Sequence, residues 1–493
     1  MSNKPNILYF VADQMRADTQ HYLGNEASIT PNLDALAAEG VAFENAYCQN
    51  PVCVPSRISF LSGLYPHTNG HRTMHFLLND DEPNILKVMK NAGYEVIWIG
   101  RNDILTGLKT KEEFCDEYYN GLSPEDTKGV LKSSSAALGH ARGGRQTKDW
   151  NDDMYSFYIG KTEPGQGGVA DEGCVRSCVE YINRKRREGN DKPFFVYCTL
   201  MYPHPPYECC DPWYSSIDRN TIGKLWPRKP VCPDKPSMII KTANNMNLHH
   251  WTEDRWDELR ATYLAQTSKF DSQLGDVVNA LKENDFYDNT SIFVFSDHGD
   301  YTGDYDIVEK VQNCFEDDLV NIPLVVKPAK QFECKPRITP ALAELVDLSA
   351  TVSEMTGVEL GYVQYGKSLL PVLAGSDEHK DAVFSEGGRV HGDYPSMEIG
   401  HQDPHDVYWP RINVQQMEGP EHTKATMIRM GNLKYVRRLY EKDELYDLEK
   451  DPDELVNRID EPEYREAIMK MQDRMLYWYQ ETADWVPNRK DVR

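Results

Sequence analysis

Short apolar runs separated by amphipathic stretches restrict the fold of this 493-residue chain more than any other feature of its sequence. The strongest runs are residues 6–12 (NILYFVA), 95–100 (EVIWIG), 194–200 (FFVYCTL) and 291–296 (SIFVFS). Such runs, bounded by turn residues, are typical of strands that are buried on both faces. Helices are expected between them, the longest at 252–284 and a short one from Thr30, with Pro31 in its first turn, to Gly40. The alternation predicts an α/β fold with a large, mostly parallel sheet flanked by helices.

The last quarter of the chain has a different pattern. Strands are expected over 381–440, including a hairpin that turns at Gly431-Asn432, and a closing helix follows over 461–482. We therefore expect an N-terminal catalytic α/β domain at 1–372 and a smaller C-terminal α+β domain with an antiparallel sheet at 373–493.

The chain is strongly acidic. It has 54 Lys and Arg against 78 Asp and Glu, which gives a formal net charge of −24. Because binding to nucleic acid or to an anionic membrane surface requires clustered Lys and Arg, we expect neither partner. No apolar run approaches the ~18 residues that a membrane-spanning helix needs. If the ligand is an anion, the positive charge that binds it must be local.

The cysteines and the first residues indicate a reducing compartment. Eleven cysteines are an odd number, and a chain of this length does not need disulfides to stabilise its core. The segment from Met1 to Pro5 runs directly into an apolar strand, without the features of a secretory signal. We expect free thiols and a cytoplasmic location, although a trimmed signal peptide would leave the same sequence. The sequence does not predict an oligomeric state.

Two of the expected strands each lead into an aspartate that is followed by a polar residue. Residues 7–12 lead into Asp13-Gln14, and residues 292–296 lead into Asp297-His298. Ligands of open α/β sheets bind beyond the carboxyl ends of the strands, so these side chains are expected to converge on one cation. Carboxylate and amide oxygens suit Ca²⁺ first, with Mg²⁺ as an alternative, and a histidine ligand admits Mn²⁺. Each pair alone is more often a turn or a helix cap, and only the occurrence of both supports a metal site.

The segment that begins at Cys53 places a cysteine at the start of a helix. In Cys53-Val54-Pro55-Ser56-Arg57 the proline suits the first helical turn, and Gly63 suits the position just past the end. Free backbone N–H groups at this start stabilise an anion and are expected to lower the pKa of the Cys53 thiol. On the cysteine alone, a buried structural residue is the stronger interpretation.

The residues around Cys53 resemble the signature of the type I sulfatases, a family within the alkaline phosphatase superfamily. Cys53-x-Pro55-Ser56-Arg57 is followed by Ser62-Gly63 at the spacing of that family. Pro203-His204-Pro205-Pro206-Tyr207 and Lys310 are similar to active-site elements of the family. The resemblance implies that a maturation enzyme oxidises Cys53 to formylglycine. The ligands that it implies for one divalent cation are Asp13, Gln14, Cys53, Asp297 and His298.

The resemblance also implies a role for each residue of the site. Hydrated formylglycine, with one hydroxyl deprotonated beside the metal, attacks sulfur in line. Arg57 positions the aldehyde residue and holds negative charge, and Asp297 accepts the proton of the nucleophile. His204 gives a proton to the leaving oxygen, while Arg101, His204 and Lys310 bind the sulfate. The second hydroxyl then expels sulfate by C–O cleavage and restores the aldehyde.

The sequence departs from the sulfatase pattern at two places. Many sulfatases have Gly-Lys-x-His where this chain has Gly100-Arg101-Asn102-Asp103, so an arginine replaces a sulfate-binding lysine and the base of the second step is unassigned. His71, Arg72 and His75 either fill this gap or are ordinary loop residues. The metal set of Asp-Gln plus Asp-His resembles that of phosphonate monoester hydrolases and choline sulfatases.

These residues lead to one principal hypothesis and two alternatives. We expect a sulfatase that hydrolyses a sulfate monoester of a sugar or an aryl alcohol. The substrate is expected to be a small molecule or an oligosaccharide. A phosphonate monoester or phosphodiester hydrolase on the same residues is the first alternative. A non-catalytic protein that binds sulfated glycans, with Cys53 left as a thiol, is the second.

Three regions are candidates for substrate contacts. The first is the segment 103–168, with Arg142 and Arg145. The second is 205–251, which is rich in Pro, Lys, Cys and Asn without clear periodicity and is expected to be a long insertion loop. The third is Arg389-Val390-His391 in the smaller domain.

Overall fold

The computed structural model, which describes residues 4–105, 111–120, 154–165, 169–393, 403–417 and 419–484, is built around a large sheet. Within these residues the sheet has eight strands in the order β10-β2-β9-β8-β1-β6-β3-β4. Their bounds are β1 Asn6–Asp13, β2 Val41–Tyr47, β3 Glu95–Gly100, β4 Glu117–Tyr119, β6 Phe194–Pro203, β8 Thr290–Ser296, β9 Leu324–Lys327 and β10 Arg337–Glu344. Strand β9 is antiparallel to both of its neighbours, and the other neighbouring pairs are parallel. The predicted fold class is confirmed.

The four strongest apolar runs form the centre of this sheet. They are β8, β1, β6 and β3, which lie side by side in that order. In β1 the side chains of Tyr9 and Val11 enter one hydrophobic core, and those of Leu8 and Phe10 enter another. Because both faces are covered, these strands need apolar residues at every position, which explains their continuous apolar runs.

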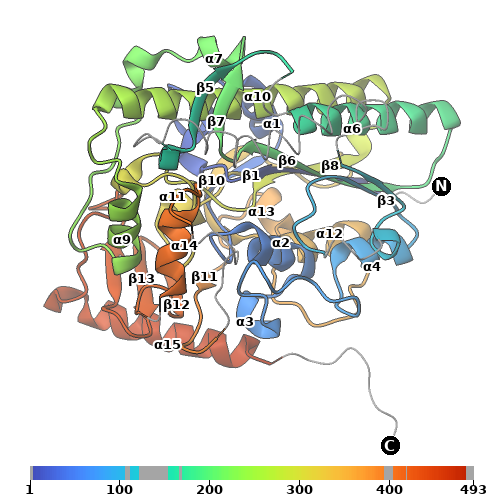
Figure 1. The fold of residues 1–493 in the computed structure, drawn as a ribbon. Coiled ribbons are helices and arrows are strands. Elements are labelled where there is room, and N and C mark those ends of the chain that lie inside the picture. Colours follow the sequence, from blue (N-terminus) through green and yellow to red (C-terminus); the bar gives the residue numbers. More distant parts are fainter. Residues whose placement is uncertain are drawn as a thin grey trace, which may run out of the picture.

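Helices cover the two faces of the sheet. Figure 1 shows α1 (Pro31–Glu39), α6 (Val169–Glu188) and α10 (Glu253–Glu283) on one face, and α2 (Cys53–Ser62), α4 (Ile85–Asn91) and α12 (Asp347–Thr356) on the other. Phe270 of α10 packs on Phe10 with ring centroids 5.0 Å apart. On the opposite face, Phe60 of α2 packs on Phe295 with centroids 5.1 Å apart. The predicted helices at 30–40 and 252–284 are therefore confirmed as α1 and α10.

Residues 205–251 form short elements, so the prediction of a loop without regular structure was wrong. The elements are β7 (Tyr207–Cys210), α7 (Trp213–Ser216), α8 (Ile222–Leu225) and α9 (Ser237–Met246). Strand β7 pairs in parallel with β5 (Tyr158–Thr162). Met238, Ile239 and Met246 are buried and attach α9 to the core. The elements β7, α7 and α8 have four residues each and are too short to show a period in the sequence, because one helical turn already takes 3.6 residues, whereas the ten residues of α9 were long enough and were missed.

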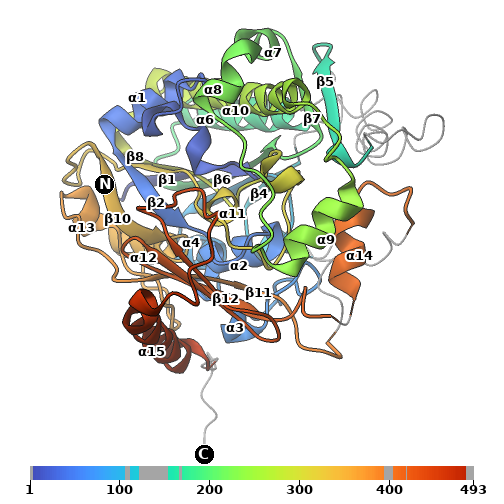
Figure 2. The same cartoon turned by 90° about the vertical axis from the view of Figure 1, so that its left-hand side faces the viewer.

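A second, antiparallel sheet lies at the C-terminal end of the chain (Figure 2). Its strands are β11 (Val383–Gly387), β12 (Ala425–Met430), β13 (Leu433–Arg438) and β14 (Glu444–Asp447). The hairpin at Gly431-Asn432 is confirmed, since Met430 pairs with Leu433 across it. The closing helix α15 (Arg465–Thr482) packs on this sheet, with Trp478 stacked on Phe384 at 4.3 Å.

The remaining helices are short and connect these layers. They are α3 (Pro66–Asn69), α11 (Asp317–Val320), α13 (Leu370–Leu373) and α14 (Trp409–Gln416). The small sheet is linked to the segment that follows β2, because the amide of Glu386 in β11 donates to the carbonyl of Gln49 at 2.9 Å. The boundary after residue 372 stays a prediction. In the part of the chain that the structure describes, no helix is long and apolar enough to cross a bilayer.

The carboxylate of Asp271 on α10 caps the start of α1. It accepts hydrogen bonds from the backbone amides of Asn32 at 3.2 Å and Leu33 at 2.7 Å. We expect Asp271→Ala to lower the free energy of unfolding by about 1–2 kcal/mol, because two amides of the first turn lose their acceptor. The shift of the denaturation midpoint measures this. Asp276→Ala, at an exposed position of the same helix, is the matched control; an equal shift in both variants would contradict the capping role.

Candidate active site

The carboxyl ends of β1 and β8 bring Asp13-Gln14 and Asp297-His298 together. The strands are parallel neighbours with Ala12 in register with Ser296, so the residues that follow them lie side by side. The amide of Asp297 donates to the carbonyl of Ala12 at 3.3 Å. The amide of Gln14 donates to Asp297 Oδ1 at 3.1 Å. The predicted convergence of Asp13 and Asp297 is therefore observed.

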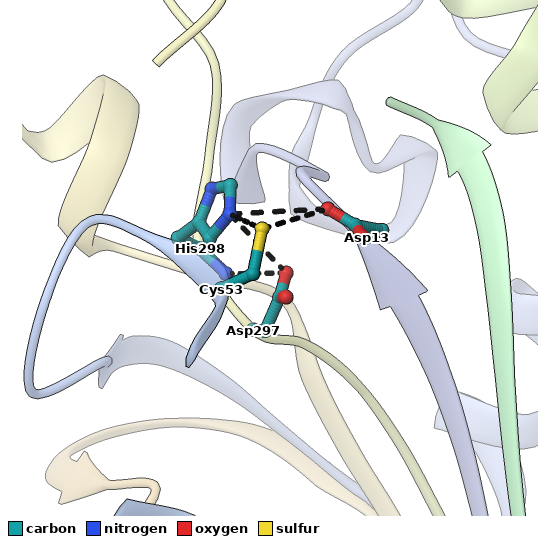
Figure 3. Close-up of side chains that lie close together, drawn as sticks. All are labelled: Asp13, Cys53, Asp297 and His298. Carbon is teal, nitrogen blue, oxygen red and sulfur yellow. Dashed lines mark hydrogen bonds and ion pairs between the residues drawn. The ribbon is translucent and has the colours of Figure 1, made fainter. Parts of the chain in front are cut away.

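Helix α2 brings Cys53 to the same point. The helix begins at Cys53, and Gly63, with φ 74°, ends it by donating its amide to the carbonyl of Ser59. Cys53 Sγ lies 3.1 Å from His298 Nε2 and 3.7 Å from Asp13 Oδ1 (Figure 3). Asp13, Cys53, Asp297 and His298 are all buried, and one ligand atom from each lies within 4.8 Å of the others.

Arg57 and Arg101 compensate the carboxylates. The Arg57 guanidinium is fully buried and donates to Asp13 Oδ2 and to Asp297 Oδ2, each at 2.9 Å. Arg101 donates to Asp13 Oδ2 at 2.5 Å and pairs with Asp103 at 2.7 Å. Burial alone would raise the pKa of Asp13, but the positive charges of Arg101, Arg57 and Lys310 hold it well below its usual range. Asp13 is therefore ionised at neutral pH.

The four-residue cluster suits a divalent cation by its donor chemistry. The arginine contacts engage Oδ2 of Asp13 and Oδ2 of Asp297, whereas the Oδ1 atoms of both residues lie 3.8 Å from His298 Nε2. Burial lowers the pKa of His298, so its imidazole is neutral and has a nitrogen lone pair to offer. Two carboxylate oxygens suit a hard cation such as Ca²⁺ or Mg²⁺, and the imidazole nitrogen admits Mn²⁺.

The Gln14 side chain has other partners. Its Oε1 accepts from Lys310 Nζ at 2.9 Å, and its Nε2 donates to Asp300 Oδ2 at 2.6 Å. Its backbone has φ 69°, in the left-handed region that residues with a side chain seldom adopt. Its predicted role as a metal ligand stays a prediction.

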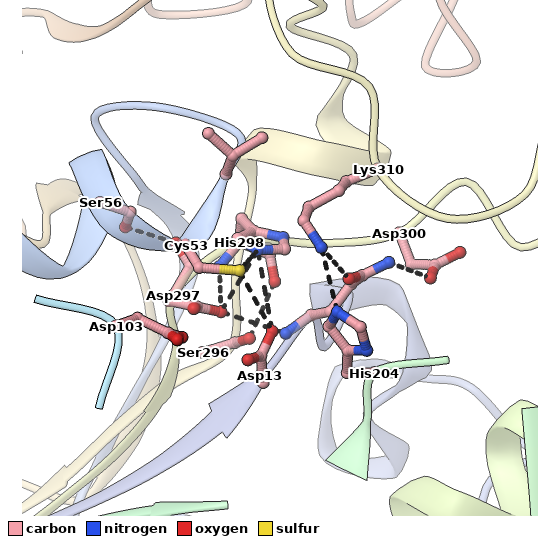
Figure 4. A network of polar contacts seen from close by, with 12 residues as sticks. Asp13, Cys53, Ser56, Asp103, His204, Ser296, Asp297, His298, Asp300 and Lys310 are labelled. Carbon is pink, nitrogen blue, oxygen red and sulfur yellow. Dashed lines mark hydrogen bonds and ion pairs between the residues drawn. The ribbon is translucent and has the colours of Figure 1, made fainter. Parts of the chain in front are cut away.

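Figure 4 shows Lys310 and His204 on the opposite side of Cys53 from Ser56 and Asp103. Lys310 Nζ is 3.1 Å from His204 Nε2, and His204 Nδ1 is 2.5 Å from the carbonyl of Pro205. Burial and the charge of Lys310 lower the pKa of His204 well below its ordinary value, so the ring is neutral. His204 therefore carries its proton on Nδ1 and accepts from the ammonium at Nε2.

The thiol of Cys53 is not activated, and this part of the sequence prediction was wrong. Burial, followed by the negative charge of Asp13, raises its pKa well above the ordinary value. The helix start at Cys53 is real, but the loss of water and the nearby carboxylate outweigh it. Within this fold the thiol is protonated and unsuited to nucleophilic attack.

The other predicted residues have partners away from the cluster, apart from Asp103. Asp103 lies in the site, 3.5 Å from Arg57. His71 binds Glu82 at 2.9 Å, and Arg72 binds Asp393 at 3.2 Å. Arg389 donates to the carbonyl of Asp393 at 3.2 Å and His391 contacts that of Gly419 at 3.4 Å. Arg142 and Arg145 lie outside the described residues.

Sequence reasoning missed three side chains that support the site. Asp300 accepts from Gln14 and from the Tyr207 hydroxyl, which lies 2.8 Å from its Oδ1. Glu309 pairs with Lys310 at 2.7 Å and also with Arg411. The nearness of Asp300 to Asp297-His298 was a usable signal. Arg411 gave none, since it lies about a hundred residues beyond Lys310 in the chain.

Comparison with known proteins agrees with this geometry. The sequence matches the family model described as "Sulfatase" over residues 5–358. It is 25% identical to the multifunctional alkaline phosphatase superfamily protein PehA of Trinickia caryophylli, over 98% of this chain and 96% of that protein. It is 23% identical to the Delta 4,5-hexuronate-2-O-sulfatase of Bacteroides thetaiotaomicron, over 94% of this chain and 86% of that protein.

The fold is shared with solved structures. The phosphonate monoester hydrolase of Agrobacterium radiobacter superposes with a TM-score of 0.73 at 20% sequence identity, covering 97% of this chain and 96% of that one. The family match extends over most of the chain and includes Asp13, Cys53, Asp297 and Lys310. The chain belongs to the sulfatase family of hydrolases, within the alkaline phosphatase superfamily, and the cluster around Cys53 is its candidate active site.

Proposed function

We propose that this sulfatase hydrolyses a sulfate monoester of a sugar or aryl alcohol, with formylglycine at position 53 and one divalent cation, Ca²⁺ first. The observation that carries the proposal is Cys53 at the start of α2, enclosed by Asp13, Asp297 and His298. The sulfatase signature resemblance supports formylglycine, and the name of the hexuronate sulfatase relative supports a sugar sulfate.

The high thiol pKa and the burial of Cys53 support oxidation before folding. Its side chain is 0% exposed, so a maturation enzyme cannot reach it in the finished fold. When bound, the cation and the hydrated aldehyde would supply an oxygen nucleophile near neutral pH. Asp13, Asp297 and His298, with position 53 and Gln14, would hold the cation.

The protein's own side chains would arrange the sulfate ester. Arg57 holds Oδ2 of both aspartates and so keeps their Oδ1 atoms directed at His298 and position 53. Lys310 and Arg101 place positive charge beside the cluster, where it stabilises sulfate oxygens. The proton for the leaving oxygen would start on Lys310 Nζ, which donates to His204 Nε2, and would reach that oxygen either from Lys310 directly or through His204 Nε2, leaving Lys310 neutral.

The cellular setting is part of the proposal. All eleven cysteines are free, and nine of them are buried. A reducing, cytoplasmic compartment suits such a set of thiols, since oxidation would not be needed to stabilise this fold.

Hydrolysis of a phosphonate monoester or a phosphodiester is the second candidate. The observation that favours it is the Asp-Gln plus Asp-His set, together with the fold shared with a phosphonate monoester hydrolase. Sulfate monoesters and phosphonate monoesters are both singly charged at the reacting centre, so charge at the site does not distinguish them.

Conversion of Cys53 is the first test. Protein produced together with a formylglycine-generating enzyme is expected to lose the sulfur of Cys53 in its intact mass and to hydrolyse an aryl sulfate. Cys53→Ala is expected to lower kcat on the order of 10⁴-fold or more, because the nucleophile is removed. Cys48→Ala, a second buried free thiol, is the control. Unmodified Cys53 with no turnover would favour the sulfated-glycan binding protein.

Removal of the cation is the second test. Chelation is expected to abolish turnover, and Ca²⁺ is expected to restore it better than Mg²⁺ or Mn²⁺. Asp297→Asn is expected to weaken the response to Ca²⁺ at least about tenfold, because a charged ligand is lost. Added Ca²⁺ should also raise the melting temperature of the wild type. Full activity after exhaustive chelation would contradict the metal site.

Substrate choice is the third test. An aryl sulfate, an aryl phosphonate and a phosphodiester with the same leaving group are compared by kcat/KM. We expect the sulfate to be preferred by at least about 100-fold, a difference of about 2.7 kcal/mol in transition-state stabilisation. A preference of that size for a phosphorus ester would favour the second candidate. Sulfated mono- and disaccharides then define the alcohol.

A further inference from the structure

The ammonium group of Lys310 has its hydrogen-bond donors engaged inside the protein. Nζ lies 2.9 Å from Gln14 Oε1, 3.1 Å from His204 Nε2 and 2.7 Å from Glu309 Oε1. An ammonium has three N–H donors, and three acceptors surround this one. A sulfate oxygen that binds Lys310 must therefore replace one of them.

Glu309 is the most firmly held of the three acceptors. Its second carboxylate oxygen pairs with the guanidinium of Arg411, which also donates to the carbonyl of Lys310 at 3.0 Å. The side chains of Glu309, Lys310 and Arg411 are 2%, 4% and 3% exposed. Charged hydrogen bonds are stronger with water excluded, so this carboxylate is the hardest of the three acceptors to displace.

The backbone at Glu309 is also constrained. Its φ of 67° is unusual for a glutamate, and such a conformation persists only when its surroundings fix it. The amide of Glu309 donates to the Tyr207 hydroxyl at 2.9 Å, and Arg411 holds the loop from α14. Helix α14 is itself tied to α9, because Asn245 donates to the carbonyl of Pro410 at 3.0 Å.

We propose that Glu309 and Arg411 are positioning residues that fix the ammonium of Lys310 for the sulfate ester. Glu309 stays bound to Nζ while a sulfate oxygen replaces His204 or Gln14 as an acceptor. Its negative charge also separates the like charges of Lys310 and Arg411. This inference rests on the proposed function, since it assigns the sulfate ester as the partner of Lys310.

The test is a double-mutant cycle of Glu309→Gln with Lys310→Ala in the matured protein. We expect Glu309→Gln to lower kcat about 10- to 100-fold with KM unchanged or lower, because the ammonium loses its anchor while the site loses a competing negative charge. In the Lys310→Ala background the same change is expected to alter kcat less than about twofold, since it acts through the ammonium.

Two further variants separate positioning from structural support. Glu316→Gln is the matched control, because Glu316 is a buried glutamate that pairs with Lys235 at 3.2 Å and accepts from Tyr301 at 2.8 Å. Any effect of Glu316→Gln on kcat should be the same in both Lys310 backgrounds. Arg411→Lys keeps the positive charge but loses the several N–H donors of the guanidinium. We therefore expect its kcat to lie between those of the wild type and Glu309→Gln.

Protection against thermal unfolding by inorganic sulfate adds a measurement that needs no turnover. Glu309→Gln should keep at least the wild-type protection, and Lys310→Ala should lose it. Unchanged kcat, equal losses in both backgrounds, or weaker sulfate protection in Glu309→Gln would overturn the inference. If the wild type turns over no sulfate ester but the protection follows the expected order, the proposed function fails and the positioning of Lys310 is supported.

Discussion

The buried guanidinium of Arg57 is the interaction on which the arrangement of the site depends. Parallel pairing of β1 with β8 places two buried carboxylates side by side, where they repel each other. Arg57 binds one oxygen of each at 2.9 Å. It lies one helical turn after Cys53, so the helix that delivers position 53 also orients Asp13 and Asp297. The position of Cys53 and the orientation of the two carboxylates are therefore fixed by one rigid element.

Local positive charge in an acidic protein follows from the same arrangement. The chain has a net charge of −24. At the site, Arg57, Arg101 and Lys310 lie beside the two carboxylates, and Arg101 shares Asp13 with Arg57. The acidic surface repels polyanions at long range, whereas the charges of Arg57, Arg101 and Lys310, which are buried or largely buried, act mainly on a group that enters the site. Such a distribution favours a small ester or the end of an oligosaccharide over continuous binding along a charged polymer.

Much of this arrangement was predictable from local sequence. The central strands were predictable because burial on both faces demands continuous apolar runs, and the limits of α2 followed from Pro55 and Gly63. Convergence of Asp13 with Asp297 followed from the rule for the carboxyl ends of parallel strands. The sign of the thiol pKa shift was not predictable, because it depends on how completely Cys53 is buried. The contact of Glu309 with Arg411 joins distant segments that carry no periodic signal.

The inert state of the thiol bears on how the site is assembled. Burial and the nearby Asp13 carboxylate raise the pKa of the Cys53 thiol, and its side chain has no exposed surface, so the folded protein disfavours both modification and nucleophilic attack at this thiol. Under the proposed oxidation of Cys53, the segment from Cys53 to Gly63 meets two demands at different times. As an extended chain it presents Cys53 to the proposed maturation enzyme. As a helix it must bury position 53 against Asp13 and His298. Pro55 is compatible with both, since it fits a first helical turn and, before folding, favours an extended backbone at Val54.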